Sequence, residues 1–392
     1  MSTSPIPAGG TAATAPGPVP DAELATRRER VLDDADRLGL DAVVVHDANR
    51  SGSAVPWLTC WQVTREAVVV LRRGAQPVLL VGFPNHLPNA RRVARDCEVT
   101  GAGDRTAESV LDALGRGPAR RVGVIGAVPH RLHAAMSAGC DVVEMDQEYV
   151  RARLRKTPYE LDVLRHAAAL TDASGAALVE AAVPGATELD LVAAVEAAYA
   201  GTGGTNHIHY VAATSMASPD RCAPGQWPTD RALAAGSVVM FELSTTWGTD
   251  YPGQLLRTVT VDAEPTPLYR SLHDVADAAL ASIVGLLRPG VLPAELLTAA
   301  DPVLDAGFTT VDDLVHGFGG GYLPPVLSHR GAPSGDDAQP LEKGMTVVVQ
   351  PNVCTPDLTA GVQTGELFEI TANGARSLHS FPTGLLSGGG AR

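Results

Sequence analysis

The sequence lacks the features that mark membrane, secreted and nucleic-acid-binding proteins. No apolar run approaches the length of a membrane span, and the N-terminus has neither the basic start nor the apolar core of a signal peptide. Acidic residues outnumber basic ones by 44 to 30, a net charge of −14, whereas a phosphate-binding surface needs clustered Lys and Arg. We therefore expect a cytoplasmic protein without a nucleic-acid or membrane partner, whose acidity serves solubility.

Cysteine is scarce and irregularly placed. The chain has five cysteines, an odd number, and none of them forms a CxxC pair. Disulfide frameworks and zinc sites both need cysteines in regular sets. We expect reduced, mostly buried thiols without a catalytic or zinc role at Cys60, Cys97, Cys140, Cys222 and Cys354.

The first part of the chain predicts a tail and a small α/β domain. Residues 1–21 hold five prolines among Ala, Gly, Ser and Thr, which is typical of a disordered tail. From residue 22 to 150, amphipathic helical patterns alternate with short β-rich runs. The pattern predicts helices at 21–38, 86–95 and 106–115, and strands at 41–46, 66–72, 77–82, 121–125 and 141–145.

A second domain is predicted over residues 151–385, before a flexible tail at 386–392. Its first helix has a clear start signal, with Thr157 as the N-cap, Pro158 at the first helical position and Glu160 placed to complete a capping box. The pattern predicts helices at 158–182, 187–201, 266–287 and 293–306, and strands at 208–214, 237–245, 254–262, 345–350 and 366–371.

The second domain also shows a weak internal repeat. Val-Pro-Gly at 183–185 and Arg-Pro-Gly at 288–290 each stand between two helical patterns. This repeat suggests a duplicated α/β unit around a central sheet, although Pro-Gly after a helix is common punctuation.

Four segments each place one polar side chain beside an apolar run, a Gly or a Pro, as strand ends and tight loops do around a pocket. Divalent ions prefer carboxylates, imidazoles or thiolates, and of the four polar residues only Glu242 and His316 offer such a group. Gln254 and Gln350 carry neutral amides, which suit a polar substrate better than a metal ion. The segments are FELS at 241–244, YPGQLLRT at 251–258, VHGFG at 315–319 and VQPN at 349–352.

Ordered motifs run through this half of the chain: KTPYE at 156–160, the strand of Glu242, LRT at 256–258, HGFG at 316–319, GMTVVVQP at 344–351 and IT at 370–371. Together they resemble the pita-bread fold of creatinase, aminopeptidase P, prolidase and methionine aminopeptidase. Residues 22–150, with WLT at 57–59, resemble the N-terminal domain of creatinase-type proteins. The resemblance implies an α/β (α+β) protein with a small creatinase-type N-terminal domain and a pita-bread C-terminal domain.

The resemblance also implies where a metal centre would lie. Metallopeptidases of this fold hold a dinuclear centre with two Asp, one His and two Glu. Matched in order, these ligands fall on Glu242, Gln254, His316, Gln350 and either Gly365 or its neighbour Glu366. With three of the five ligands lost, firm coordination of a water-activating ion is not expected. We expect no metal and no cofactor.

In character the chain looks closest to the metal-free branch, creatinase and ectoine hydrolase, and FELS at 241–244 is similar to the ectoine hydrolase type. It departs from creatinase in placing Gly225 where creatinase has a loop His, and Leu256 where it has a Glu. His207 and His209 alternate along a strand, so we expect both on one face, where either can replace that His. His209 is the preferred candidate.

The leading hypothesis is a metal-independent hydrolase, or related lyase, that acts on a C–N bond of a small polar nitrogen compound. Glu242 and His316 would form its acid/base pair, with His209 as a third catalytic residue. The alternative for Glu242 is a buried salt bridge to Arg257. Substrate contacts are expected from Gln254, Gln350, Asn352, Asp250, Tyr251, His329 and Glu366.

Two rival functions stay open. One is a catalytically inactive pita-bread protein that binds a small ligand or a peptide, with Gln254 and Gln350 as inert remnants of lost ligands. The other, less expected, is an Xaa-Pro-type metallopeptidase with a rearranged site. The C–N chemistry itself rests on fold analogy.

The resemblance further predicts a homodimer, because metal-free proteins of this fold pair so that one subunit's N-terminal domain borders its partner's pocket. Light scattering at micromolar concentration should therefore give about twice the chain mass of 40.6 kDa. A single species at the chain mass would contradict the expectation.

Overall fold

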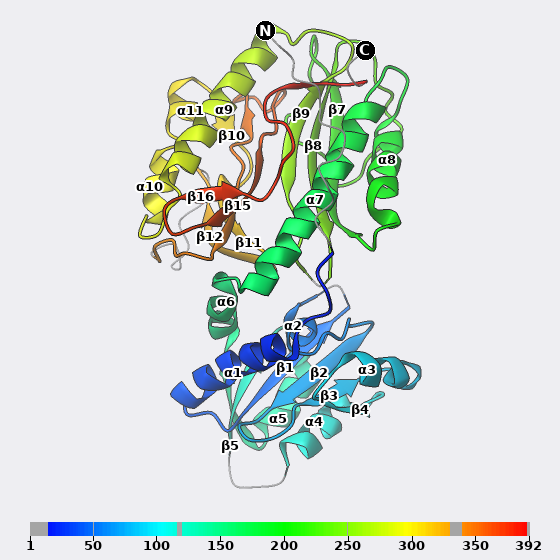
Figure 1. Ribbon diagram of the computed structural model, residues 1–392, viewed down its shortest axis with the longest axis vertical. Helices are drawn as coiled ribbons and strands as arrows, with labels where there is room; N and C mark the ends of the chain where they lie inside the picture. The colour runs from blue at the N-terminus through cyan, green and yellow to red at the C-terminus, as the bar shows by residue number, and fades with distance from the viewer. Residues whose placement is uncertain (1–14, 50, 116–119, 249, 330–338, 390–392) are drawn as a thin grey trace. The chain divides into compact units, whose positions relative to one another are not determined.

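The computed structural model describes residues 15–49, 51–115, 120–248, 250–329 and 339–389 of the 392-residue chain. These residues form two compact units, Gly17–Arg153 and the chain from Leu154 onward (Figure 1). Both units combine helices with a β-sheet, which confirms the predicted α/β class. Among the described residues, no helix combines the length and the apolar character that crossing a membrane requires. Of the predicted N-terminal tail, residues 1–14 lie outside the described ranges.

The N-terminal unit is built on one mixed sheet with the strand order β4-β3-β2-β1-β5-β6. Strand β1 pairs antiparallel with β2 and parallel with β5. The β-branched runs predicted as strands are buried here, and they pack with residues of α4 and α5 in one apolar core. The strands are β1 (Ala42–Ala48), β2 (Glu66–Leu71), β3 (Val78–Val81), β4 (Glu98–Gly101), β5 (Arg120–Ile125) and β6 (Cys140–Glu144).

The helical segments of this part of the chain include one short 3-10 turn. The predicted helix at 86–95 is shorter, because the 3-10 turn at Pro84–His86 precedes it. The helices are α1 (Asp21–Arg37), α2 (Ala54–Thr59), α3 (Leu87–Val93), α4 (Thr106–Leu114), α5 (His130–Ser137) and α6 (Asp146–Leu154).

The second unit contains a large sheet with the strand order β12-β11-β13-β15-β9-β8-β7. Neighbouring strands in this order are antiparallel, and the two halves of the sheet meet where β15 pairs with β9. The strands are β7 (Thr205–Ser215), β8 (Ser237–Thr246), β9 (Leu255–Thr260), β11 (Val315–Phe318), β12 (Tyr322–Leu327), β13 (Thr346–Val349) and β15 (Gly365–Ile370). Shorter pieces are β10 (Thr309–Thr310), β14 (Val353–Cys354), β16 (Ala375–Ser377) and β17 (Leu386–Ser387).

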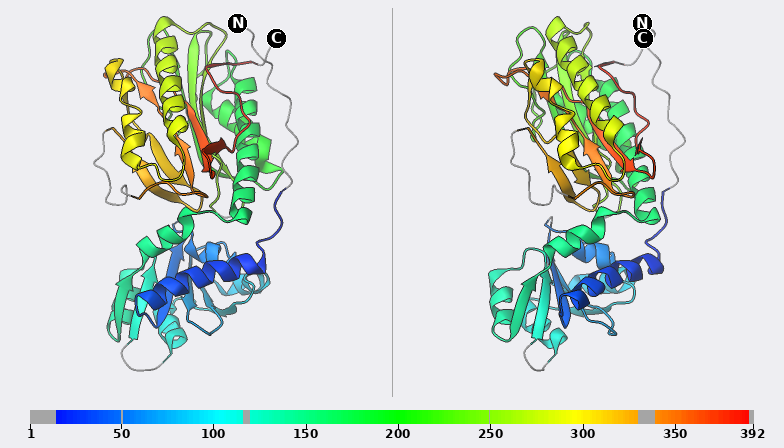
Figure 2. Two further views of the ribbon diagram at one scale, coloured as in Figure 1. Left: turned by 60° about the vertical axis from the view of Figure 1, so that its left-hand side comes forward. Right: turned by 90° about the vertical axis from the view of Figure 1, so that its left-hand side faces the viewer.

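Helices lie along the strands of this sheet, as Figure 2 shows from two further sides. The apolar faces of α7 (Pro158–Ala181) and α8 (Glu188–Ala200) pack on β7, β8 and β9. Helix α9 (Pro267–Leu286) packs through Tyr269, Leu272 and Ala276 in a second apolar cluster. Burial of these apolar surfaces removes them from water and stabilises the sheet.

The start of α7 confirms the predicted capping box. The backbone N–H of Glu160 donates to Thr157 Oγ1 at 3.2 Å, and the backbone N–H of Thr157 donates to Glu160 Oε2 at 2.8 Å. The predicted helix at 293–306 instead consists of α10 (Pro293–Thr298) and α11 (Pro302–Asp305). Pro302 has no N–H to continue the first helix, so it begins a new one.

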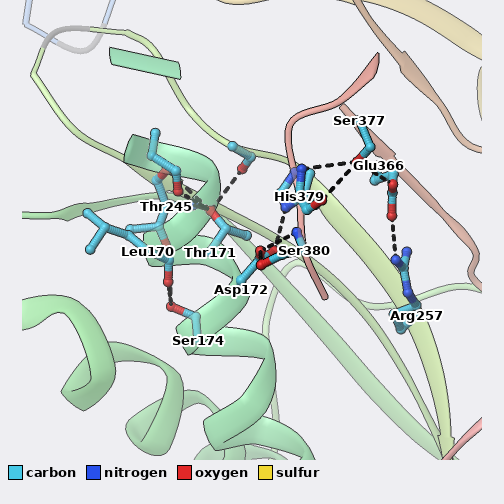
Figure 3. Close-up of polar contacts among 12 residues, drawn as sticks. Leu170, Thr171, Asp172, Ser174, Thr245, Arg257, Glu366, Ser377, His379 and Ser380 are labelled. Atoms are coloured by element: carbon cyan, nitrogen blue, oxygen red, sulfur yellow. Dashed lines mark hydrogen bonds and ion pairs between the residues drawn. The ribbon is translucent and has the colours of Figure 1, made fainter. Parts of the chain in front are cut away.

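A C-terminal strap, residues 375–389, lies against α7 and β9 (Figure 3). His379 Nδ1 donates to Asp172 of α7 at 2.6 Å, and the backbone N–H of Ser380 donates to the same carboxylate at 2.7 Å. The residues predicted as a flexible tail are therefore partly ordered, because Leu386–Ser387 form β17 beside β9. Residues 390–392 lie outside the described ranges.

Next to the strap, Arg257 of β9 forms a buried ion pair with Glu366 of β15 (Figure 3). The guanidinium also donates to the carbonyl oxygens of Pro382 and Gly365, both at 2.7 Å. Ser377 Oγ donates to the other Glu366 oxygen at 2.5 Å. The pair thus joins the two halves of the sheet to the strap.

Replacing Glu366 by Gln should leave the Arg257 charge buried without a counter-ion. Because loss of one partner from a buried ion pair costs about 3–5 kcal/mol, we expect a loss of that order in the free energy of unfolding, measured by urea denaturation. Asp104→Asn, which breaks the exposed Arg65–Asp104 pair, is the control and should change little. Equal stability of the two variants would contradict this account.

Candidate functional site

The second unit holds a cavity of about 590 Å³ at the point where β7, β8 and β11 approach one another. Its lining includes the four polar residues singled out in the sequence. Glu242 lies on β8, Gln254 directly precedes β9, His316 lies on β11 and Gln350 directly follows β13. The prediction that these four segments surround one pocket is confirmed.

The amide of Gln254 links the carboxyl of Glu242 to the amide of Gln350. Gln254 Nε2 donates to Glu242 Oε1 and to Gln350 Oε1, each at 2.9 Å. The side chain of Gln350 in turn lies beside the ring of His316. A row of neighbouring polar groups therefore crosses the cavity wall from β8 to β11.

Glu242 is held in a setting that favours its protonated form. It interrupts the apolar run of β8, whose backbone is paired on both sides by β7 and β9. Burial, together with the nearby charge of Asp312, raises the pKa of Glu242 to about 8. At neutral pH this side chain is mostly an uncharged hydrogen-bond donor. It makes no ion pair with Arg257, which pairs with Glu366 instead.

His316 is fixed by the geometry of β11. Its ring stacks on Tyr322 with the ring centres 4.1 Å apart, and burial lowers the pKa of His316 to about 4. Because its pKa is lowered, His316 presents a neutral imidazole to the cavity at neutral pH. The residue after it is a glycine, Gly317, because a Cβ at that position would lie 2.5 Å from the carbonyl oxygen of Pro324.

Two further carboxyl groups, Asp312 and Asp313, line the cavity just before β11. Asn352 Nδ2 donates to Asp312 at 3.0 Å, and burial raises the pKa of Asp312. The hydroxyl of Tyr322 donates to Asp313. Sequence reasoning missed both aspartates. The available signal was an adjacent acidic pair a few residues before the strand of His316.

The two histidines of β7 do not share a face, and the expectation that they do is wrong. A register shift between Asn206 and Ile208 places His207 at a bulge, where its ring lines the cavity. His209 lies outside the cavity lining, and its Nε2 is 3.0 Å from the hydroxyl of Tyr199 on α8. Burial lowers the pKa of both imidazoles.

Other residues predicted to contact substrate make contacts outside the cavity lining. The hydroxyl of Tyr251 donates to Glu160 Oε1 at 2.6 Å and so supports the start of α7. Glu366 is committed to Arg257 and Ser377.

Three predicted contact residues remain. His329 Nε2 lies 3.8 Å from Asp301 Oδ1, away from the cavity lining. The backbone oxygen of Asp250 accepts a hydrogen bond from the N–H of Gly320 at 2.7 Å, which ties this loop to the glycines after β11. Asn352 acts on the cavity only through Asp312.

The side chains at the cavity do not fit a dinuclear metal centre. Gln254 and Gln350 offer neutral amides, Gly365 has no side chain, and Glu366 is turned to Arg257. Within the described ranges, no three or more His, Cys, Asp and Glu gather so that they could hold a metal ion.

Comparisons with known proteins agree on one family. Residues 162–372 match the model of "Metallopeptidase family M24". A "Probable dipeptidase PepE" of Mycobacterium tuberculosis is 28% identical over 261 residues, which cover 66% of this chain and 67% of that protein. An "Xaa-Pro dipeptidase" of Pyrococcus furiosus is 25% identical over 228 residues, 58% of this chain and 63% of that protein.

Solved structures show the same fold. A prolidase from Pyrococcus horikoshii superimposes with a TM-score of 0.79 at 19% identity, over 92% of this chain and 99% of that one. Dipeptidase PepE from Mycobacterium ulcerans gives 0.78 at 24% identity, over 95% of this chain and 99% of that one. The predicted pita-bread fold is confirmed.

The prediction of a metal-independent, creatinase-type C–N hydrolase is wrong, as is the expectation that metallopeptidase activity is unlikely. The matched family model describes metallopeptidases, and the curated relatives are dipeptidases. The likeness to the creatinase and ectoine hydrolase branch is not confirmed. The error arose because the family branch was inferred from five ligand positions alone. The family match instead extends over the whole segment 162–372.

The protonated state of Glu242 predicts a pH-dependent stability. Its pKa rises from an ordinary 4.5 to about 8 on folding, so its favourable contribution is complete below about pH 4.5 and is lost as pH rises through 8. The side chain of the Glu242→Gln variant does not titrate. The free energy of unfolding of this variant, relative to that of the parent protein, should therefore increase between about pH 5 and about pH 8.5, as measured by urea denaturation at both pH values.

The matched control is Glu264→Gln, at a position where the side chain is 94% exposed. Its stability relative to the parent should be the same at both pH values. A pH-independent difference for Glu242→Gln as well would show that Glu242 titrates normally.

Proposed function

This chain belongs to metallopeptidase family M24, and from that premise we propose that it hydrolyses short peptides of about dipeptide size. The observation that carries the proposal is the convergence of Glu242, Gln254, His316 and Gln350 on one cavity within the matched segment. A cavity of about 590 Å³ lies within the size range of small-molecule sites. Relatives named as dipeptidases support a short peptide as the substrate.

The proposed roles follow from the protonation states of the side chains. Glu242 holds a proton at neutral pH and would donate it to the peptide nitrogen as the C–N bond breaks. His316 is neutral and would take a proton from the water as its oxygen attacks the carbonyl carbon, and this proton would return to Glu242 after the amine has left. Gln254 holds Glu242 and Gln350 in place through its two hydrogen bonds, and Gln350 lies beside His316.

The family name implies metal ions, but the donor set of this cavity does not fit a dinuclear centre. No step of the proposal therefore runs through a metal ion.

A second candidate function is the binding of a short peptide without turnover. It is favoured by the same two amides, because Gln254 and Gln350 place neutral groups at two positions that the sequence resemblance assigns to metal-binding carboxylates. An assay for turnover separates the two functions.

We further propose that the protein acts in the cytoplasm as a homodimer. Support for a reducing compartment comes from the cysteines, none of which forms a disulfide bond within the described ranges.

Hydrolysis should be measured with a panel of dipeptides and dipeptide amides, Ala-Pro and Ala-Ala among them. The protein is assayed as purified and with added Mn²⁺, Co²⁺ or Zn²⁺, and release of free amino acid supports the proposal under any of these conditions. Glu242→Gln and His316→Asn should each lower kcat/KM by ~10²–10⁴-fold at nearly unchanged melting temperature.

The control is His209→Asn, whose ring contacts Tyr199 outside the cavity lining. Its kcat/KM should stay close to that of the parent protein. If no member of the panel is cleaved while a peptide still binds, the binding function replaces the peptidase.

A further inference from the structure

The cavity has an uneven balance of charge. Three carboxyl side chains line it, those of Glu242, Asp312 and Asp313, and the described lining residues include no Lys or Arg. The lining also includes the imidazoles of His207 and His316. Glu242 is mostly uncharged at neutral pH, so the negative charge of the cavity comes from Asp312 and Asp313. A carboxylate brought into this cavity meets like charge without a Lys or Arg partner, whereas an ammonium group meets opposite charge.

Aromatic rings form a second part of the wall. Phe318 and Tyr322 stand edge to face with their ring centres 6.3 Å apart, and His207 lies 5.9 Å from Phe318. Tyr210 adds a further ring from β7. The faces of Tyr and Phe rings attract ammonium groups, so this wall reinforces the preference that the carboxyl groups create.

A buried polar group without a partner lies next to the wall, outside the cavity lining. Ser244 is fully buried on β8, two residues after Glu242, so its side chain projects from the same face of the strand. It stands opposite Ile208, which lines the cavity. Within the described part of the chain its hydroxyl has no hydrogen-bond partner.

The carboxyl groups are positioned by neighbouring side chains. Asn352 holds Asp312 through its Nδ2, while its own Oδ1 is buried and lacks a partner among the described residues. Tyr322 holds Asp313 through its hydroxyl. Fixed acceptors beside an aromatic wall form a ready receptor for the several N–H donors of an ammonium group.

We propose that the cavity binds the ammonium end of a short peptide and selects against a free carboxylate, so that its preferred substrates are peptides with a net positive charge. This inference rests on the proposed function for the peptide nature of the ligand. It adds the selection rule: a blocked C-terminus is favoured, and a blocked N-terminus is rejected.

Isothermal titration with three probes of one skeleton tests the charge rule. Ala-Pro amide carries one positive charge, Ala-Pro is zwitterionic, and N-acetyl-Ala-Pro amide is neutral. We expect Ala-Pro amide to bind about tenfold or more tightly than either of the others, and to weaken as salt rises from about 50 to about 300 mM. Equal affinities, tighter binding of Ala-Pro, or no measurable binding of any probe would overturn the proposal.

Two variants locate the preference. Asp312→Asn and Asp313→Asn should each reduce the advantage of Ala-Pro amide over the neutral probe several-fold, whereas the control Asp162→Asn, on the exposed side of α7, should keep it. Melting temperatures show whether each variant folds. If one aspartate variant does not fold, the other one tests the assignment. The assignment is overturned if every folded aspartate variant keeps the full preference for Ala-Pro amide over the neutral probe.

Binding and turnover report on separate claims. If the charge preference is found but no peptide is cleaved, the proposed peptidase function falls and the selection rule stands. If peptides are cleaved without any charge preference, the selection rule falls and the peptidase function stands.

Discussion

The side-chain amide of Gln254 is the interaction on which the site depends. An amide nitrogen has two N–H groups, and here one donates to Glu242 and the other to Gln350, so both halves of the cavity wall are joined at one buried atom. A carboxylate at this position would face Glu242 as a like charge and would need a cation between them. With an amide, the wall is complete without a counter-ion, and Glu242 keeps its proton.

The molecule therefore combines the fold of a metallopeptidase family with a site of different chemistry. Helices α7, α8 and α9 pack on the antiparallel sheet, and the cavity lies at the positions that the sequence resemblance assigns to a metal centre. Glu366, which the resemblance offers for the last ligand position, is a structural group here, since its partner is Arg257 and its second contact is the C-terminal strap. A fold positions side chains, while the chemistry is set by which side chains stand at the positions it offers.

Some features could be predicted because their causes are local in the chain. The capping box at Thr157 and Glu160 spans a single helical turn, and in the strand of Glu242 the run at 238–243 is apolar except for Glu242 itself. The ordered motifs around Gln254, His316 and Gln350 also placed the cavity correctly. The split of the helix expected at 293–306 had a visible cause in Pro302, which was not weighed.

By itself, then, the sequence determined the fold, the segments that surround the cavity and the neutral character of its central amides, since each depends on residue type and short spacing. Only the tertiary structure decided the rest. The bulge that separates His207 from His209 arises from the pairing of β7 with β8, and the partner of Glu366 lies more than a hundred positions away at Arg257. Asp312 and Asp313 lie just before β11, and the hydroxyl of Tyr322 at the start of β12 donates to Asp313 across the cavity wall. Such contacts follow from long-range pairing and register, which no local pattern in the chain records.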